Sequence, residues 1–271
     1  LQRLVQQLDA PDIATNWSAP ALRWHRNGKV LEGIDVLPAI KLADLQGITR
    51  QKELLERNTR QFLAGLPANN ALLWGSRGTG KSSLIKALLN RYHDEGLRLI
   101  EVEPAELTDL PSIVQQIQGR DERFIIYCDD LSFEAGDPGY KALKSALDGS
   151  LSSTPENLLI YATSNRRHLL PEYMSENLQA EVVDTEVHFG DSIEEKISLS
   201  ERFGLWLSFY PFNQDEYLAI SEYWLVQHGI TKFDAEARAE ALRWAQARGS
   251  RSGRAAWQFA RDWAGRCLLE P

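Results

Sequence analysis

The stretch GSRGTGKS, from Gly75 to Ser82, decides the fold of this chain. It fits the pattern G-x-x-x-x-G-K-[ST] and lies between a short apolar run, NALLW, and a run with helical spacing, SSLIKALLNRYHDEG. Glycines let the backbone wrap closely around an anion, so amide N–H groups and a helix N-terminus can face phosphate oxygens. We expect Lys81 to reach the β and γ phosphates of a nucleotide. The predicted phosphate contacts are Gly75, Ser76, Arg77, Gly78, Thr79, Gly80, Lys81, Ser82 and Ser83.

A second apolar run, RFIIYCDD, ends in two aspartates, Asp129 and Asp130. A nucleotide site built on a phosphate loop also needs an acid that holds Mg²⁺ through its water shell, and this acid normally stands at the end of an apolar strand. Asp129 meets that requirement. The predicted magnesium ligands are therefore the Ser82 hydroxyl and the Asp129 carboxylate, whereas the pattern leaves the role of Asp130 open.

Strand-like and helix-like segments alternate from residue 70 to residue 211. The five apolar segments NALLW, LRLIEVE, RFIIYCDD, NLLIYATSN and LWLSFYPF have the near-continuous hydrophobicity of strands buried on both faces. Helical segments between such strands imply right-handed crossovers and a parallel sheet. We therefore predict an α/β fold of the P-loop NTPase type, with a five-stranded parallel sheet sandwiched by helices.

The flanking segments predict three parts. Residues 1–44 form an N-terminal appendage, with a helix over LQRLVQQL and a hairpin whose Asn27-Gly28 pair suits a type I′ turn. Residues 45–211 form the nucleotide-binding core. Residues 212–271 contain three segments with helical stripes of apolar residues, and we expect them to form a small all-helical lid.

The composition is that of an ordinary soluble globular protein, with 43% hydrophobic and 25% charged residues. The sequence has no apolar run near the roughly 20 residues that cross a bilayer and no leader-like start, so we expect a cytoplasmic protein without a membrane partner. The formal net charge of -8 argues against a strong nonspecific grip on nucleic acid. Cys128 and Cys267 are expected to be reduced core residues.

The phosphate loop, IIYCDD, LIYATSN, ERFG and the C-terminal helices together resemble an AAA+ ATPase domain. The longer motifs CDDLSFE, YKALKSALDG, LIYATSNRRHL and SLSERFGLWLSFYPF are more specifically similar to the bacterial AAA+-like family called domain of unknown function 815. The resemblance runs from about Ile40 to the C-terminus. It implies an AAA+-like fold with ATP and Mg²⁺ as ligands.

The resemblance also implies roles for two residues of the core. Asn165, at the end of LIYATSN, would sense the γ-phosphate and orient the attacking water, or it would cap the following helix instead. Arg202 in SERFG matches the position from which many AAA+ subunits extend an arginine into a neighbour's site, where it stabilises charge on the transferring phosphoryl group. The alternative for Arg202 is an ordinary surface arginine.

Further residues would contact the nucleotide from outside the phosphate loop. Arg254 in SGRAAWQF matches the lid arginine that contacts bound nucleotide in the same subunit, although Arg251 or Arg248 could take this role. The segment LQGI resembles the one that packs against the adenine base, and this implies a purine contact by Gly47 and Ile48.

Two departures from the family pattern affect the expected chemistry. Asp130 stands where AAA+ domains usually carry a water-activating glutamate, and its carboxylate is set back by about 1.5 Å, one carbon–carbon bond length. Misplacement on that scale can cost about 100-fold in rate. Glu134 could replace it as the base. The second departure is the basic group Arg166, Arg167 and His168, which could serve a neighbouring subunit, a polyanionic partner or only the solvated start of a loop.

These observations favour an ATPase that converts ATP to ADP, assembles as a homo-oligomer through Arg202 and transmits lid motion to a protein client that the sequence does not identify. The alternative is a nucleotide-gated binding switch with slow or negligible hydrolysis. A small-molecule kinase is less well supported, because the C-terminal helices resemble an AAA+ lid. A clamp-loader or helicase-loader role stays open, but the acidic composition gives it no support.

Overall fold

The structure is a computed structural model, and it describes residues 15–133, 137–148, 155–167, 169, 181–183, 186–188 and 199–269. The helix predicted over LQRLVQQL lies outside these ranges. So do Glu134, His168 and most of the helix predicted in SIEEKISLSERFG.

The central sheet has seven strands in the order β2-β1-β4-β5-β6-β3-β9. All five predicted strands are present, and neighbours among them pair in parallel. The predicted number of five is too low, because strand β1 of the N-terminal hairpin pairs in parallel with β4 and extends the sheet by two strands. The bounds are β1 (Ala21–His25), β2 (Val30–Ile34), β3 (Ala71–Gly75), β4 (Leu97–Glu101), β5 (Arg123–Cys128), β6 (Leu158–Ser164) and β9 (Leu205–Phe209).

The N-terminal hairpin joins the sheet because one of its faces is apolar. Leu22 and Trp24 alternate along β1 and are fully buried in the same cluster as residues of β4 and β5. The predicted type I′ turn is wrong. His25 pairs with Val30, so four residues form the loop, and it is Lys29 that has a positive φ angle, of 48°. A separate antiparallel pair, β7 (Glu181–Val183) and β8 (Glu186–His188), lies between β6 and β9 in the chain.

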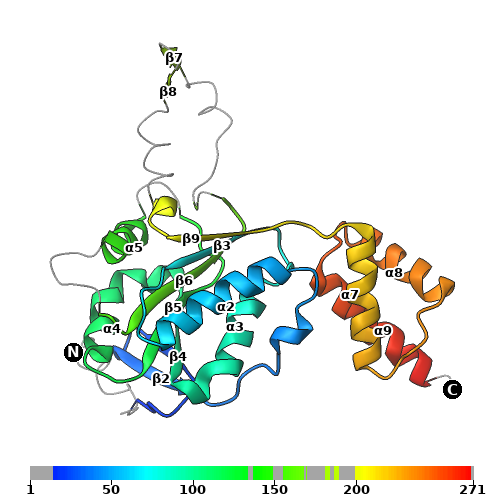
Figure 1. Ribbon diagram of the computed structural model, residues 1–271, viewed down its shortest axis with the longest axis horizontal. Helices are drawn as coiled ribbons and strands as arrows, with labels where there is room; N and C mark the ends of the chain where they lie inside the picture. Colours follow the sequence, from blue (N-terminus) through cyan, green and yellow to red (C-terminus); the bar gives the residue numbers. More distant parts are fainter. Residues whose placement is uncertain are drawn as a thin grey trace, which may run out of the picture.

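Helices cover both faces of the sheet, as Figure 1 shows. Along β5, Ile125 and Tyr127 pack in the cluster that contains α2 and α3, whereas Phe124 and Ile126 pack in the cluster that contains α4 and α5. This alternation buries every second residue on the same side. The helices of the core are α2 (Thr49–Leu63), α3 (Lys81–Tyr92), α4 (Leu110–Ile117) and α5 (Pro138–Asp148), and the short 3-10 turns are η1 (Leu42–Asp44), η2 (His93–Glu95) and η3 (Pro104–Asp109).

The three predicted C-terminal helices are present as α7 (Gln214–Gln227), α8 (Ala235–Ala247) and α9 (Gly253–Leu269). Figure 1 shows them as a bundle beside the sheet, joined to it by the chain that follows β9. Asn213 begins α7 with a reciprocal capping box to Glu216, with both hydrogen bonds at 2.9 Å. This bundle is called the lid below. The domain boundaries at residues 45 and 211 stay predictions.

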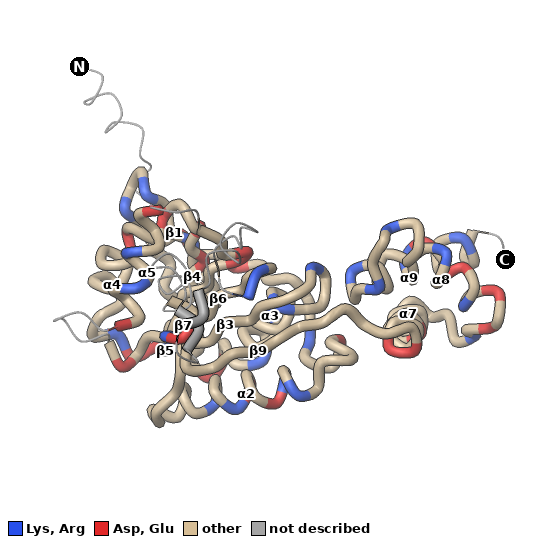
Figure 2. Tube along the Cα trace, turned by 90° about the horizontal axis from the view of Figure 1, so that it is seen from above, with Lys and Arg blue, Asp and Glu red and all other residues tan. Residues whose placement is uncertain are grey.

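Cys128 is buried, as predicted, but the core position predicted for Cys267 is wrong. Cys267 lies in the last turns of α9, where Leu268 and Leu269 are also exposed, because the helix runs past its packing partners. No helix in the described ranges is long and apolar enough to cross a membrane. Basic and acidic residues are interspersed along both core and lid (Figure 2).

Candidate active site

The phosphate loop, Gly75–Ser82, connects β3 to α3 and contacts both sheet and lid. Gly75 and Gly78 have φ angles of 126° and 73°, which favour glycine. A Cβ atom on Gly75 would lie 2.0 Å from the Phe209 carbonyl oxygen, so a side chain there would displace β9. The Gly78 carbonyl accepts a 3.2 Å hydrogen bond from the Arg254 amide. The loop is therefore shaped from one side by the sheet and from the other by the lid.

The Lys81 ammonium group lies at the base of this loop, and the residue is only 7% exposed. Its Nζ atom donates to the Gly75 carbonyl (2.7 Å), the Ser76 carbonyl (2.8 Å) and Asn165 Oδ1 (3.2 Å). Burial lowers the pKa of Lys81 to about 8, although the neighbouring carboxylates act in the opposite direction. These three acceptors hold the Lys81 ammonium group against the inner side of the loop.

Ser82 and Asp129 lie side by side, as the predicted magnesium pair requires. Ser82 Oγ donates to Asp129 Oδ1 at 2.7 Å, and Thr163 Oγ1 donates to the same oxygen at 2.6 Å. Burial would raise the pKa of the Asp129 carboxyl, but these hydrogen bonds outweigh it and lower the pKa. Oxygen donors of this kind fit Mg²⁺. No group of three His, Cys, Asp or Glu in the described ranges could hold a metal ion by itself.

The position of Thr163 is the main feature that the sequence interpretation missed. Strands β5 and β6 pair Cys128 with Ala162, so the next residues along each strand, Asp129 and Thr163, become neighbours. Thr163 is 1% exposed. A polar residue at the carboxyl end of an apolar strand, two places before Asn165, was the available signal.

Asp130 contacts the side chains of Thr163, Asn165 and Arg77. Its amide donates to Thr163 Oγ1 at 2.9 Å, and its Oδ1 accepts a short hydrogen bond from Asn165 Nδ2. Its Oδ2 lies 3.8 Å from an Arg77 guanidinium nitrogen. The φ angle of 49° places Asp130 in the left-handed region, which aspartate tolerates better than most residues. The structure therefore brings Asp130 and Asn165 together at the phosphate loop, whereas Glu134 lies outside the described residues.

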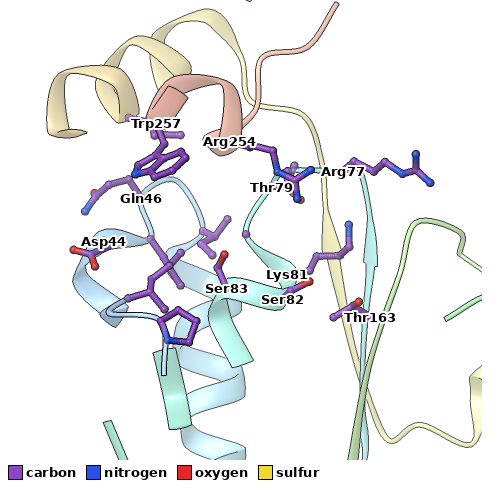
Figure 3. A pocket seen from close by; sticks show the side chains of 18 of the residues that line it. Asp44, Gln46, Arg77, Thr79, Lys81, Ser82, Ser83, Thr163, Arg254 and Trp257 are labelled. Atoms are coloured by element: carbon purple, nitrogen blue, oxygen red, sulfur yellow. The ribbon is translucent and has the colours of Figure 1, made fainter. Parts of the chain in front are cut away.

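These groups line a cavity of about 730 Å³, called the main cavity below. One end is polar and contains Arg77, Lys81, Ser82, Asp129 and Asp130. Figure 3 shows the phosphate loop facing this space, with Arg254 and Trp257 above it. The other end is apolar, and its side chains come from the segment before α2 and from the lid: Pro38, Ile40, Leu45, Ile48, Phe212, Ile220, Trp224 and Trp257.

The apolar end has the composition of a site for a flat heterocycle. Ile48 lines it, as expected for a base contact. Gly47 has a φ angle of 74°, and a Cβ atom on it would lie 2.8 Å from the Phe212 ring, so Gly47 lets the chain pass close beneath that ring. A direct contact of Gly47 with a base stays a prediction. Trp257, on α9, was not anticipated from the sequence.

Among the three candidate lid arginines, Arg254 lines the main cavity. The Arg248 guanidinium stacks over the Trp244 ring at 3.6 Å, inside the lid. Arg251 is exposed, and its carbonyl accepts a hydrogen bond from the Phe212 amide. The geometry therefore favours Arg254 as the lid contact.

Arg202 does not line the main cavity; it forms an ion pair with Asp148 at the end of α5. A contact of Arg202 with phosphate in its own chain is not supported by this arrangement. Arg166 and Arg167 are exposed, and the Arg167 guanidinium lies over the Trp74 ring at 5.6 Å. These two cations lie just beyond Asn165 but do not line the cavity.

The sheet order, the phosphate loop after β3, the acid pair after β5 and the C-terminal lid define an AAA+ P-loop ATPase fold. A variant of Thermotoga maritima RuvB matches with a TM-score of 0.56 at 15% identity, over 82% of this chain and 63% of that chain. The Aeropyrum pernix Orc1 protein in complex with DNA matches with a TM-score of 0.53 at 16% identity, over 84% of this chain and 62% of that chain. At these identities the likeness shows the fold. This chain spans less than two thirds of either neighbour.

The sequence identifies the family within this class. The chain belongs to the family described as a protein of unknown function, DUF815, whose profile matches residues 17–267. No curated protein matches the chain.

Proposed function

We propose that the chain is a Mg²⁺-dependent ATPase of the AAA+ type. The observation that carries this proposal is the convergence of Lys81, the Ser82–Asp129 pair and Asp130 at the polar end of one cavity whose other end is apolar. A nucleoside triphosphate has the same division into a charged and a flat apolar part. The three cations Lys81, Arg77 and Arg254 supply the positive charge that the phosphates need.

Each polar side chain has a place in hydrolysis. Lys81 would bind the β and γ phosphates, and Asn165 would orient a water molecule against the γ-phosphorus. As the water oxygen forms its bond to phosphorus, the bond from phosphorus to the β–γ bridging oxygen breaks, and ADP leaves. The proton lost by the water passes to the Asp130 carboxylate. Mg²⁺ held by Ser82 and Asp129 would supply charge neutralisation on the phosphate oxygens.

The lid would report which nucleotide is bound. Arg254 lines the cavity with its side chain and is tied to Gly78 of the phosphate loop through its backbone amide. A change in phosphate occupancy would therefore act directly on the start of α9. Coupling of this kind supports transmission of lid motion to a client, whose identity the site does not specify.

A homo-oligomer would bring Arg202 of one subunit to the site of the next. Arg202 lies outside the main cavity of its own chain, which supports a role in a neighbour rather than in its own site. Nucleic acid is not indicated as a partner. The Orc1 neighbour binds DNA, but this chain is acidic, and its charges are interspersed along core and lid.

The second candidate is a nucleotide-gated switch with slow or negligible hydrolysis. It is favoured by the short side chain of Asp130 and by the contacts that hold its carboxylate. Both candidates require nucleotide binding, and they differ in turnover.

The test compares ATP binding and steady-state hydrolysis in the wild type, Lys81→Ala and Lys141→Ala. Lys141 is an exposed residue of α5 outside the cavity, so its variant is the matched control and should behave as the wild type. Lys81→Ala should abolish binding or turnover. Unchanged ATP affinity and turnover in Lys81→Ala would contradict the site assignment. A wild type that binds ATP without measurable turnover would favour the nucleotide-gated switch.

A further inference from the structure

Arg77 is the third residue of GSRGTGKS, where many side chains are compatible with the motif. Its side chain is 79% exposed, lines the main cavity and lies beside Asp130. Because the backbone of the phosphate loop carries it, Arg77 can remain near the terminal phosphate of a bound nucleotide. Neither the packing of the core nor the binding of the lid requires a guanidinium at this exposed position.

The partner of Arg77 is the residue that takes the proton in the proposed reaction. Each Asp130 carboxylate oxygen faces a donor side chain, Oδ1 the Asn165 amide and Oδ2 the Arg77 guanidinium. The amide group of Asp130 is also engaged, with Thr163. In this arrangement both carboxylate oxygens of Asp130 are directed at donor groups of the protein.

The Arg77–Asp130 contact is easily exchanged. The two atoms are 3.8 Å apart and both side chains are mostly exposed, and ion pairs of this kind contribute little to stability. A terminal phosphate carries more charge than a carboxylate and presents three oxygens to the planar fork of a guanidinium. A γ-phosphate at the polar end of the cavity should therefore attract Arg77 away from Asp130. An ADP molecule has no such group.

We infer that Arg77 is a γ-phosphate sensor and an internal catalytic cation that also restrains Asp130. Without a γ-phosphate, Arg77 and Asn165 hold the Asp130 carboxylate. With ATP bound, Arg77 moves to the γ-phosphate, stabilises the charge that develops during transfer and leaves Asp130 free to accept the proton from water. This inference rests on the proposed ATPase function and assigns a regulatory step to the same site.

The experiment measures ADP affinity, affinity for a non-hydrolysable ATP analogue and steady-state turnover in four proteins: the wild type, Arg77→Ala, Arg77→Lys and Arg91→Ala. Arg91 is an exposed arginine of α3 that pairs with Glu95 outside the cavity, so Arg91→Ala is the control for loss of one surface cation. Arg77→Ala should keep its ADP affinity within about twofold, lose about tenfold in affinity for the analogue and lose about 100-fold in turnover. Arg77→Lys should recover part of the loss, because an ammonium group keeps the charge without the fork.

The ratio of the two affinities separates a sensor from a structural residue, since a distorted loop would weaken both nucleotides alike. Structures of the complexes with ADP and with the analogue should place Arg77 beside Asp130 in the first and on the γ-phosphate in the second. Equal losses for ADP and analogue, or wild-type turnover in Arg77→Ala, would overturn the inference while leaving the ATPase proposal intact. A wild type that binds neither nucleotide would overturn both.

Discussion

Tyr223 Oη donates a 2.7 Å hydrogen bond to Asp44 Oδ1 and so joins helix α7 of the lid to the η1 turn before the core, across 179 positions of sequence. Asp44 and the adjacent lid residue Trp224 both line the apolar end of the main cavity. Burial and the Asp44 carboxylate raise the pKa of Tyr223 to about 12, so the hydroxyl keeps its proton to a higher pH than an ordinary tyrosine does. The contact therefore ties the lid to the segment before the core at the apolar end of the main cavity.

Tyr223→Phe should loosen this closure without changing the phosphate loop. A hydrogen bond to a charged group contributes about 1.5 to 3 kcal/mol, so nucleotide affinity should fall by about 10- to 150-fold. Calorimetric titration with ADP measures the effect. Tyr210→Phe is the matched control, because Tyr210 is 65% exposed and does not line the cavity. Equal affinities in the wild type and Tyr223→Phe would show that the contact does not position the lid.

Thr163→Val should weaken the proposed magnesium site by removing a hydrogen bond to Asp129. The hydroxyl of Thr163 donates to the Asp129 carboxylate and accepts from the Asp130 amide. Valine therefore removes one hydrogen-bond partner from each of these two groups. The Asp130 amide keeps its 3.1 Å hydrogen bond to Asp129 Oδ1, but the loss of both Thr163 hydrogen bonds should lower the free energy of unfolding by about 1 to 3 kcal/mol. We also expect the apparent Mg²⁺ affinity of the ATP complex to fall by about tenfold, measured as the Mg²⁺ dependence of turnover. Thr163→Ser keeps the hydroxyl and should stay near wild type; an equal loss in Thr163→Ser would show that the hydrogen bonds of Thr163 are not what supports the site.

The sequence permitted prediction of those parts of the site that are contiguous in the chain. The loop from Gly75 to Ser82 and the acid at Asp129 follow from local patterns, because each pattern must fall at the carboxyl end of a strand. Thr163, Trp257 and Tyr223 could not be placed in this way. They reach the cavity through strand register and through the position of the lid, and both depend on packing between distant segments.

The same limit explains the errors in the fold. The hairpin was predicted, but the apolar face of β1 did not reveal that its partner would be the edge of β4. The pair Asn27-Gly28 suits a two-residue turn, yet the pairing of His25 with Val30 leaves a four-residue loop. The local residue pattern alone determines neither which strand lies beside a given strand nor the length of the loop between paired strands.

Arg202 should act in the site of a neighbouring subunit. Arg202→Ala should keep ATP binding and lose about 100-fold in turnover, because one cation facing the transferring phosphoryl group is removed. Mixing the Lys81→Ala and Arg202→Ala variants gives a sharper test. Lys81→Ala subunits lack a working phosphate loop but keep Arg202, so adding them to Arg202→Ala subunits should restore part of the activity. Mass measurement with and without nucleotide should show an oligomer. A strictly monomeric Arg202→Ala protein with full turnover, or mixtures without recovery, would exclude a shared site.

The short side chain of Asp130 should limit the rate of hydrolysis. Asp130→Asn keeps the size of the side chain but cannot accept a proton, so turnover should fall by about 100-fold while ATP binding persists. Asp130→Glu extends the carboxylate by one methylene towards the water and should raise turnover. Its cost is stability, since glutamate tolerates the φ angle of 49° less well than aspartate, and the free energy of unfolding should drop by about 1 kcal/mol.

Glu134→Gln completes this series, because Glu134 is the other candidate base. Steady-state hydrolysis and thermal unfolding of the three variants should be measured together with ADP affinity, which checks that each cavity remains intact. If Asp130 is the base, Glu134→Gln keeps wild-type turnover and Asp130→Glu exceeds it. Turnover that survives Asp130→Asn but disappears in Glu134→Gln would identify Glu134 as the base. In that case Asp130 would serve to hold Arg77 and Asn165 at the phosphate loop, where its carboxylate already contacts both side chains.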